Sequence, residues 1–166
     1  VRPAWEPLPV SPSNSPQVIY KWRETADALR QLADQGASGP TGEVEVAYIN
    51  PETGGHVTPT MGCTVLLLRP GARTRAKRRT GSAVYHVVQG RGSTVINGRR
   101  FHWQKGDSFA LPPWSWYEHA SESDEESFLF AITDLPLFHA LGLYREELYE
   151  ANGGHQQVAE DVARAS

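Results

Sequence analysis

The sequence predicts an all-β fold, an antiparallel barrel or sandwich with short flanking helices. Short β-prone runs recur along the chain, and turn signals rich in Gly, Pro and Asn separate them. The clearest of these signals is Asn97-Gly98, which lies between two β-prone runs. Both residues tolerate the positive φ angles of a tight hairpin turn, so the pair predicts a β-hairpin.

Each expected strand has its own pattern. Residues 44–49 alternate between apolar and other side chains, as a strand with one buried face does. Residues 64–68 form a continuous apolar run, so we expect a strand that is buried on both faces. Further short strands are expected at 84–88, 93–96, 99–103, 109–111 and 127–132.

Two helices are expected to flank the strands. The first spans 22–35, with Thr25 as its N-cap, Gly36 as its stop and an apolar stripe of Ala28, Leu29, Leu32 and Ala33. The second spans 137–149, which has apolar residues at helical spacing. The expected organisation is therefore a Pro-rich arm or linker plus a short helix (1–43), a barrel (44–135), and a C-terminal helix with a frayed tail (136–166).

Composition excludes several classes of protein. A net charge of −3 argues against general nucleic-acid binding. Cys63 is the single cysteine, so an intrachain disulfide framework is excluded, and its apolar neighbours predict a buried side chain. The sequence contains no apolar run of membrane-spanning length and no signal-peptide pattern, so we expect a cytoplasmic protein that does not bind membranes.

Two glycine-bounded blocks resemble the paired sequence motifs of the cupin family. Gly71 and Gly90 bracket the first block, and the second contains Gly106-Asp107 followed by Pro112-Pro113. Cupins are small antiparallel jelly-roll barrels, so the resemblance implies a cupin-type jelly-roll β-barrel.

A closer resemblance, over most of residues 16–150, is to the gentisate 1,2-dioxygenase family of two-cupin, ring-cleaving enzymes. It rests on residues 48–55, on 58–92 and on 112–147. The resemblance implies that this chain is the C-terminal cupin of such an enzyme, or a stand-alone relative of that half. In the family, Fe(II) lies in the N-terminal cupin, where both atoms of O₂ enter a hydroxylated aromatic acid.

The resemblance places the paired histidine ligands of a cupin at Lys77 and Arg79, and the third ligand at Tyr117. Arginine stays protonated in proteins and lysine is a cation at neutral pH, so neither is a plausible ligand. We therefore expect no metal and no catalytic residue in this chain. Cations that point into a barrel need a carboxylate partner, for which Glu118 is a candidate, or they form an anion pocket.

Three alternatives remain open. In the first, His86 and His119 form a displaced metal site with Tyr117. In the second, Lys77, Arg79 and Tyr117 bind a small carboxylate or aromatic acid, and His119 and Trp116 are further ligand-binding candidates. In the third, which we favour, the chain is non-catalytic and supports an N-terminal cupin and a homo-oligomer, a dimer or larger. In that reading Trp114 and Trp116 pack at the barrel end.

Overall fold

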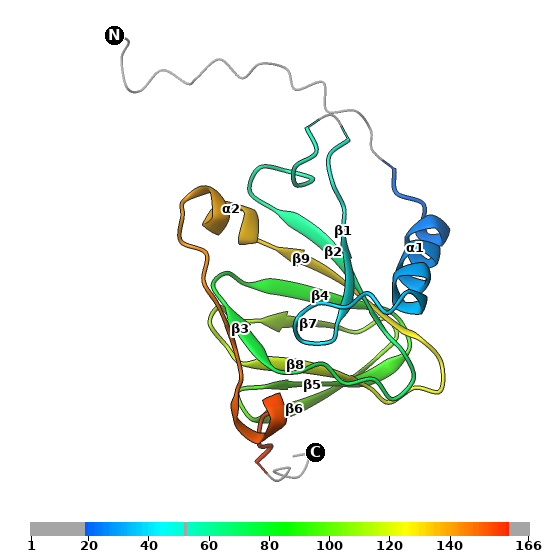
Figure 1. The fold of residues 1–166 in the computed structure, drawn as a ribbon, viewed down its shortest axis with the longest axis vertical. Coiled ribbons are helices and arrows are strands. Elements are labelled where there is room, and N and C mark those ends of the chain that lie inside the picture. Colours follow the sequence, from blue (N-terminus) through cyan, green and yellow to red (C-terminus); the bar gives the residue numbers. More distant parts are fainter. Residues whose placement is uncertain (1–18, 52, 160–166) are drawn as a thin grey trace.

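The computed structural model describes residues 19–51 and 53–159, so residues 1–18 of the predicted Pro-rich arm lie outside the described residues. Two antiparallel β-sheets face each other, and one long helix covers part of the outer face of the first sheet (Figure 1). No helix within the described ranges has the length and apolarity needed to span a membrane. The all-β, antiparallel prediction is confirmed, and the arrangement is that of a jelly-roll barrel.

Each sheet contains five strands. The first has the order β1 (Val44–Ala47), β2 (Gly62–Leu68), β9 (Ser127–Thr133), β4 (Ala83–Gln89) and β7 (Ser108–Leu111). The second has the order β10 (Glu146–Leu148), β3 (Lys77–Arg79), β8 (Tyr117–Ser121), β5 (Arg91–Ile96) and β6 (Arg99–Gln104). Strands distant in sequence lie side by side in both sheets, so the structure depends on long-range pairing.

Strand β2 contributes to two hydrophobic clusters. Leu66 and Leu68 point between the sheets, into a cluster that also contains Tyr85, Trp103 and Leu129. Val65 and Leu67 point outward and pack under helix α1 (Trp22–Asp34), against Ala26, Leu29 and Phe128. Successive side chains of a strand point to opposite faces of the sheet, which explains why β2 contributes to both clusters. The prediction that this strand is buried on both faces is confirmed.

The predicted hairpin is also confirmed. Ile96 of β5 pairs with Arg99 of β6, and Asn97 and Gly98 between them have φ angles of 47° and 77°. These are the left-handed values that a two-residue turn requires.

Helix α1 is confirmed, but its cap is not the predicted one. The helix begins at Trp22 with Lys21 at the N-cap position, so Thr25 lies inside the first turn. Thr25, Ala26 and Leu29 form its buried face. Ala28, predicted to lie on that face, is exposed.

The prediction of one helix over 137–149 is wrong beyond its first part. Helix α2 covers only Leu135–Ala140, and Gly142 follows with a φ of 67°, which interrupts the helical path. The chain then forms β10, which pairs with β3 and extends the second sheet beyond residue 135. Pairing of residues 146–148 with the short strand β3 therefore prevails over the helical spacing of the apolar residues.

Residues 151–159, which we call the C-terminal segment, are not the frayed tail that was predicted. They include the 3-10 helix η1 (Ala151–Gly154) and Gln156, which is 5% exposed. The backbone amide of Ala76 donates to the carbonyl of Gly154 at 2.7 Å. The segment is thus held against the loop before β3, and positions 160–166 of the predicted tail lie outside the described residues.

Candidate functional site

The candidate site is a small cavity of about 20 Å³ inside the barrel. Its walls come from both sheets and from the segment that joins α1 to β1. The lining residues are polar or charged for the most part: Thr41, Glu43, Glu45, Leu66, Thr74, Arg75, Lys77, Tyr85, Tyr117 and His119. The interior cavity therefore contains three of the positions that the sequence singled out, and Arg79 lies beside it.

Lys77 forms a buried ion pair with Glu43. Lys77 is 9% exposed and Glu43 is 8% exposed, and the Nζ atom of Lys77 donates to Oε1 of Glu43 at 2.6 Å. The second carboxylate oxygen accepts hydrogen bonds from the amide of Thr41 at 2.9 Å and from its hydroxyl. Both carboxylate oxygens of Glu43 and the ammonium group of Lys77 therefore have hydrogen-bond partners within the chain.

The pair keeps both of its charges. Burial raises the pKa of Glu43, but the hydrogen bonds from Lys77 and Thr41 outweigh it, so the pKa lies below its ordinary value. Burial likewise lowers the pKa of Lys77, but the hydrogen bond and the charge of Glu43 outweigh it and raise the pKa. A neutral lysine, the form that could bind a metal ion, is therefore disfavoured.

Arg79 points to the same side of β3 as Lys77, because the two residues are separated by one position in a strand. Its guanidinium carbon lies 5.8 Å from the ring centroid of Tyr117. No ion pair joins Arg79 to a carboxylate within residues 19–51 and 53–159. Burial opposes the charge of Arg79, but the phenols of Tyr117 and Tyr85 and the carboxylate of Glu45 raise its pKa, so it remains a cation.

Arg78, between these two residues, faces outward. Its guanidinium lies 4.6 Å from the ring centroids of both Trp114 and Trp116, and its Nε donates to Glu147 at 2.9 Å. Trp116 also packs edge-on against Tyr149. The two tryptophans thus pack around a cation on the outer side of the second sheet, and Trp116 does not reach the interior cavity.

Tyr117 and His119 lie on the same face of β8, as predicted from their spacing. Each is 3% exposed, and their ring centroids lie 5.6 Å apart. The phenol oxygen of Tyr117 and Nε2 of His119 are buried and have no hydrogen-bond partner in the described part of the chain. Burial, followed by the charges of Lys77 and Arg79, lowers the pKa of His119 to about 3, so its imidazole is neutral.

Thr94 determines which nitrogen of His119 carries the proton. The indole Nε1 of Trp103 can only donate, and it donates to Oγ1 of Thr94 at 2.9 Å. Thr94 is 0% exposed, and the remaining partner of its hydroxyl is Nδ1 of His119, at 2.8 Å. The Thr94 hydroxyl therefore donates to Nδ1, which leaves the proton of the neutral imidazole on Nε2. His119 presents an N–H donor to the cavity.

His86 lies on the opposite side of β4 from the cavity. It is exposed, and its Nδ1 lies 3.0 Å from the hydroxyl oxygen of Ser108. The displaced metal site would need His86 beside His119 and Tyr117, and the structure does not bring it there. The described residues contain no cluster of three or more His, Cys, Asp or Glu side chains able to hold a metal ion.

The side chains at the three ligand positions do not fit Fe(II). Lys77 is an ammonium bound to Glu43, Arg79 is a permanent cation, and the phenol of Tyr117 has a pKa raised by burial. Arg79 repels a divalent metal ion, Lys77 already engages the carboxylate of Glu43, and the imidazole of His119 presents an N–H in place of a lone pair. The donor set therefore opposes a metal centre.

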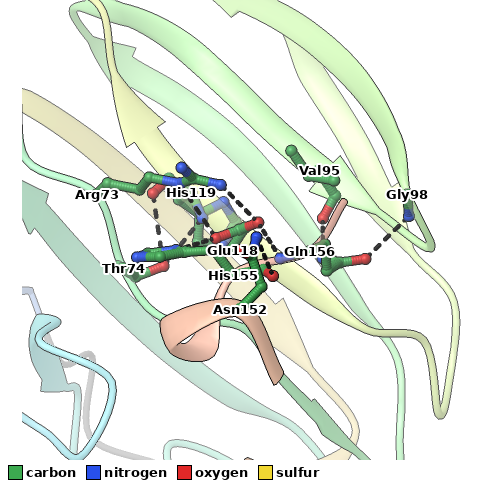
Figure 2. A network of polar contacts seen from close by, with 9 residues as sticks. All are labelled: Arg73, Thr74, Val95, Gly98, Glu118, His119, Asn152, His155 and Gln156. Atoms are coloured by element: carbon green, nitrogen blue, oxygen red, sulfur yellow. Dashed lines mark hydrogen bonds and ion pairs between the residues drawn. The ribbon is translucent and has the colours of Figure 1, made fainter. Parts of the chain in front are cut away.

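Glu118, which the sequence offered as a partner for the interior cations, faces the other way (Figure 2). It is 1% exposed and accepts hydrogen bonds from Arg73 at 3.0 and 3.2 Å. It also accepts from Nδ1 of His155 at 2.7 Å and from the amide of Gln156 at 3.0 Å. Glu118 thus anchors the C-terminal segment to the outside of β8, while its neighbour His119 lines the cavity.

Sequence reasoning missed Glu43, Tyr85 and Thr94. Glu43 lies 34 positions from Lys77 in the chain, and Thr94 lies 25 positions from His119. Each belongs to an element whose local pattern predicts only a strand or a loop. No signal in the sequence connects them to the cavity, because long-range pairing alone brings them there.

Comparison with known proteins identifies the domain. The cupin domain family matches residues 64–133. A 5-aminosalicylate 1,2-dioxygenase of Comamonas sp is 43% identical over 148 residues, which are 89% of this chain and 39% of that protein. A gentisate 1,2 dioxygenase 1 of Aquipseudomonas alcaligenes is 32% identical over 133 residues, covering 80% of this chain and 38% of that protein.

A solved structure agrees with these relatives. The salicylate 1,2-dioxygenase from Pseudaminobacter salicylatoxidans superposes with a TM-score of 0.71 at 34% identity. The match covers 77% of this chain and 38% of that one. This chain therefore spans less than two fifths of the length of each of the three relatives. It is a cupin domain related to the gentisate-type ring-cleaving dioxygenases.

Proposed function

We propose that this chain is the metal-free, C-terminal cupin of a gentisate-type dioxygenase and that its role is to support a catalytic barrel. In this proposal Fe(II) and the ring-cleavage reaction belong to an N-terminal cupin of the natural protein. The chain contributes no ligand and no catalytic residue. The substrate of the whole protein would be a hydroxylated aromatic acid, the class named in its relatives.

The observation that carries the proposal is the Lys77–Glu43 ion pair. An ammonium–carboxylate pair, bound at 2.6 Å and buried, stands at a position where the family resemblance calls for an imidazole ligand. Arg79, a cation, and Tyr117, a neutral phenol, complete a set that offers no ligand to a metal ion. The short coverage of the relatives, 38% and 39%, supports a fragment or half of a longer enzyme.

Exposed apolar side chains support a role in assembly. Val84 and Ile132 pair directly across β4 and β9, on the part of the outer face that α1 leaves open, and are 53% and 37% exposed. Cys63, predicted to be buried but only partly buried in the structure, continues the same row on β2, opposite Ile132. We propose that a second copy of the chain covers this row, since an exposed apolar row suits a two-fold contact.

Metal content and activity test the proposal together. The chain is purified from cells grown with added iron, and iron content and O₂ consumption are measured with gentisate and with salicylate. We expect iron far below one atom per chain and no ring cleavage. One iron per chain with turnover would contradict the proposal and favour a single-barrel enzyme. The reading frame upstream of the Val1 codon is then inspected for a second pair of cupin motifs, which we expect to find.

A separate experiment tests the assembly role. Val84→Arg should shift the chain toward monomer in analytical ultracentrifugation, because it places a charge in the proposed contact. Phe101→Arg is the matched control, since Phe101 is 42% exposed but lies on β6 of the other sheet. Equal behaviour of the two variants would refute the contact through Val84.

A further inference from the structure

The interior cavity presents hydrogen-bond donors that have no acceptor within the described protein. The hydroxyl of Tyr117 and the Nε2–H of His119 are both buried, line the same cavity and have no partner there. Leaving a buried donor unsatisfied costs about 1–3 kcal/mol. Two such donors side by side point to an acceptor that the protein itself does not supply.

The protonation states make this wall a donor surface. The phenol of Tyr117 is neutral, because burial raises its pKa, and it can therefore donate. Tyr85, whose pKa burial also raises, lines the cavity from the opposite sheet. His119 is neutral and carries its proton on Nε2, because Thr94 occupies Nδ1.

A partly buried arginine beside the cavity favours an anion over a cation. Lys77 lines the cavity but forms the ion pair with Glu43, so these two charges compensate each other, whereas Arg79, over Tyr117, forms no ion pair with a carboxylate of the described residues. Arg79 is therefore the cation left for a bound anion, and the carboxylates of Glu45 and Glu146 weaken its field without forming an ion pair with it. Both oxygens of Glu43 are already engaged, by Lys77 and Thr41, so its repulsion of an incoming anion is reduced.

The size of the cavity limits what can bind. A volume of about 20 Å³ accommodates a single centre of the size of a water molecule or a halide. An aromatic acid, or the carboxylate group of one, does not fit beside Tyr117 and His119 without movement of the surrounding strands.

We propose that the barrel interior is a site for one halide-sized monovalent anion, bound between the hydroxyl of Tyr117 and Nε2–H of His119. Arg79 provides the favourable field. The anion thus occupies the part of the barrel interior in which the relationship to cupin enzymes would suggest a metal cation. This inference is independent of the proposed supporting role, because a structural cupin can be stable with or without a bound anion.

Bromide provides the direct test, because it scatters anomalously and is close to chloride in size. Crystals grown in sodium bromide should show an anomalous peak in hydrogen-bond contact with the Tyr117 hydroxyl and His119 Nε2. A water molecule at that position, with no anomalous peak at high bromide, would overturn the proposal.

Chloride binding can also be measured in solution by NMR, which makes the test independent of crystals. The Nε2–H resonance of His119 should shift in a saturable way on titration with sodium chloride at constant ionic strength, with gluconate as the replaced anion. The Tyr117→Phe variant should bind chloride roughly tenfold to a hundredfold more weakly, since one donor to the anion is lost. Arg79→Met should weaken it similarly.

Matched variants on the outer surface serve as controls. Tyr149→Phe and Arg78→Met change the same residue types, but these side chains pack around Trp116 outside the barrel. Both should keep the chloride affinity of the wild type. Equal loss in the inner and outer variants, or an unshifted Nε2–H resonance in the wild type, would contradict an interior anion site.

Discussion

Removing the cation of the buried ion pair should destabilise the fold more than any exposed charge does. Lys77→Met leaves the carboxylate of Glu43, which is 8% exposed, without its counter-charge at 2.6 Å. Breaking a buried pair on one side costs about 3–5 kcal/mol. For a domain of this size the melting temperature should fall by about 6–20 °C.

A double-mutant cycle separates the pair from its surroundings. Glu43→Gln alone should also destabilise the protein, because it leaves Lys77 unpaired in the interior. The double variant should recover a large part of the loss, giving a coupling energy above roughly 1.5 kcal/mol between the two positions. Urea unfolding monitored by circular dichroism measures all four free energies of unfolding.

An exposed pair on the same strand provides the control. Arg78 and Glu147 join β3 to β10 with side chains that are 29% and 45% exposed. Glu147→Gln should cost no more than about 1 kcal/mol, since exposed ion pairs contribute little. If Lys77→Met costs as little as Glu147→Gln, the assignment of a buried, strongly coupled pair is refuted.

The pH dependence gives a second measure of the same pair. The lowered pKa of Glu43 contributes stability that is fully present above its ordinary value of 4.5 and is lost as pH falls through the folded-state pKa. The raised pKa of Lys77 contributes stability that is present below 10.5 and is lost as pH rises through the folded-state pKa. The double variant should lack both of these losses.

Three further outcomes follow from the fold and the cavity. Gly92→Ala should lower the free energy of unfolding by about 1–3 kcal/mol or more, because a Cβ there would lie 2.2 Å from a backbone carbonyl oxygen of β8. In the control Gly55→Ala, the added Cβ lies 3.5 Å from its nearest atom, so the free energy of unfolding should change by less than roughly 0.5 kcal/mol. NMR should show His119 neutral, with its proton on Nε2, down to about pH 4, since its pKa is lowered to about 3; titration near pH 6.5 would contradict its burial beside cations. Glu118→Ala should increase amide exchange throughout the C-terminal segment by removing the acceptor of the Gln156 amide, and unchanged exchange would show that other contacts hold the segment.

Local patterns predicted most of the strands. The apolar run of β2, the Asn97-Gly98 turn and the alternation along β4 are properties of neighbouring residues, so the sequence expresses them directly. Strand β10 was mistaken for helix because its three residues, Glu146–Leu148, depend on hydrogen bonds to β3 and have exposed side chains. Such an edge strand has no apolar alternation by which to detect it.

Part of the candidate site followed from the sequence. The spacing of Tyr117 and His119 placed both on one face of a strand, and the structure confirms that shared face. The partner of Lys77 did not follow, because Glu43 belongs to a segment before the barrel and meets Lys77 only through the tertiary fold. Glu118, next to the site in sequence, points outward to Arg73, since adjacent residues of a strand face opposite sides.

Histidine substitutions at Lys77 and Arg79 alone would leave a carboxylate inside the barrel with only Thr41 to satisfy it. That carboxylate could then complete a set of two imidazoles and one carboxylate, an arrangement that suits non-haem iron. An engineer who wished to load this barrel with metal would therefore draw the third ligand from the connection between α1 and β1. Redesign of the interior would have to treat that connection as part of the same unit.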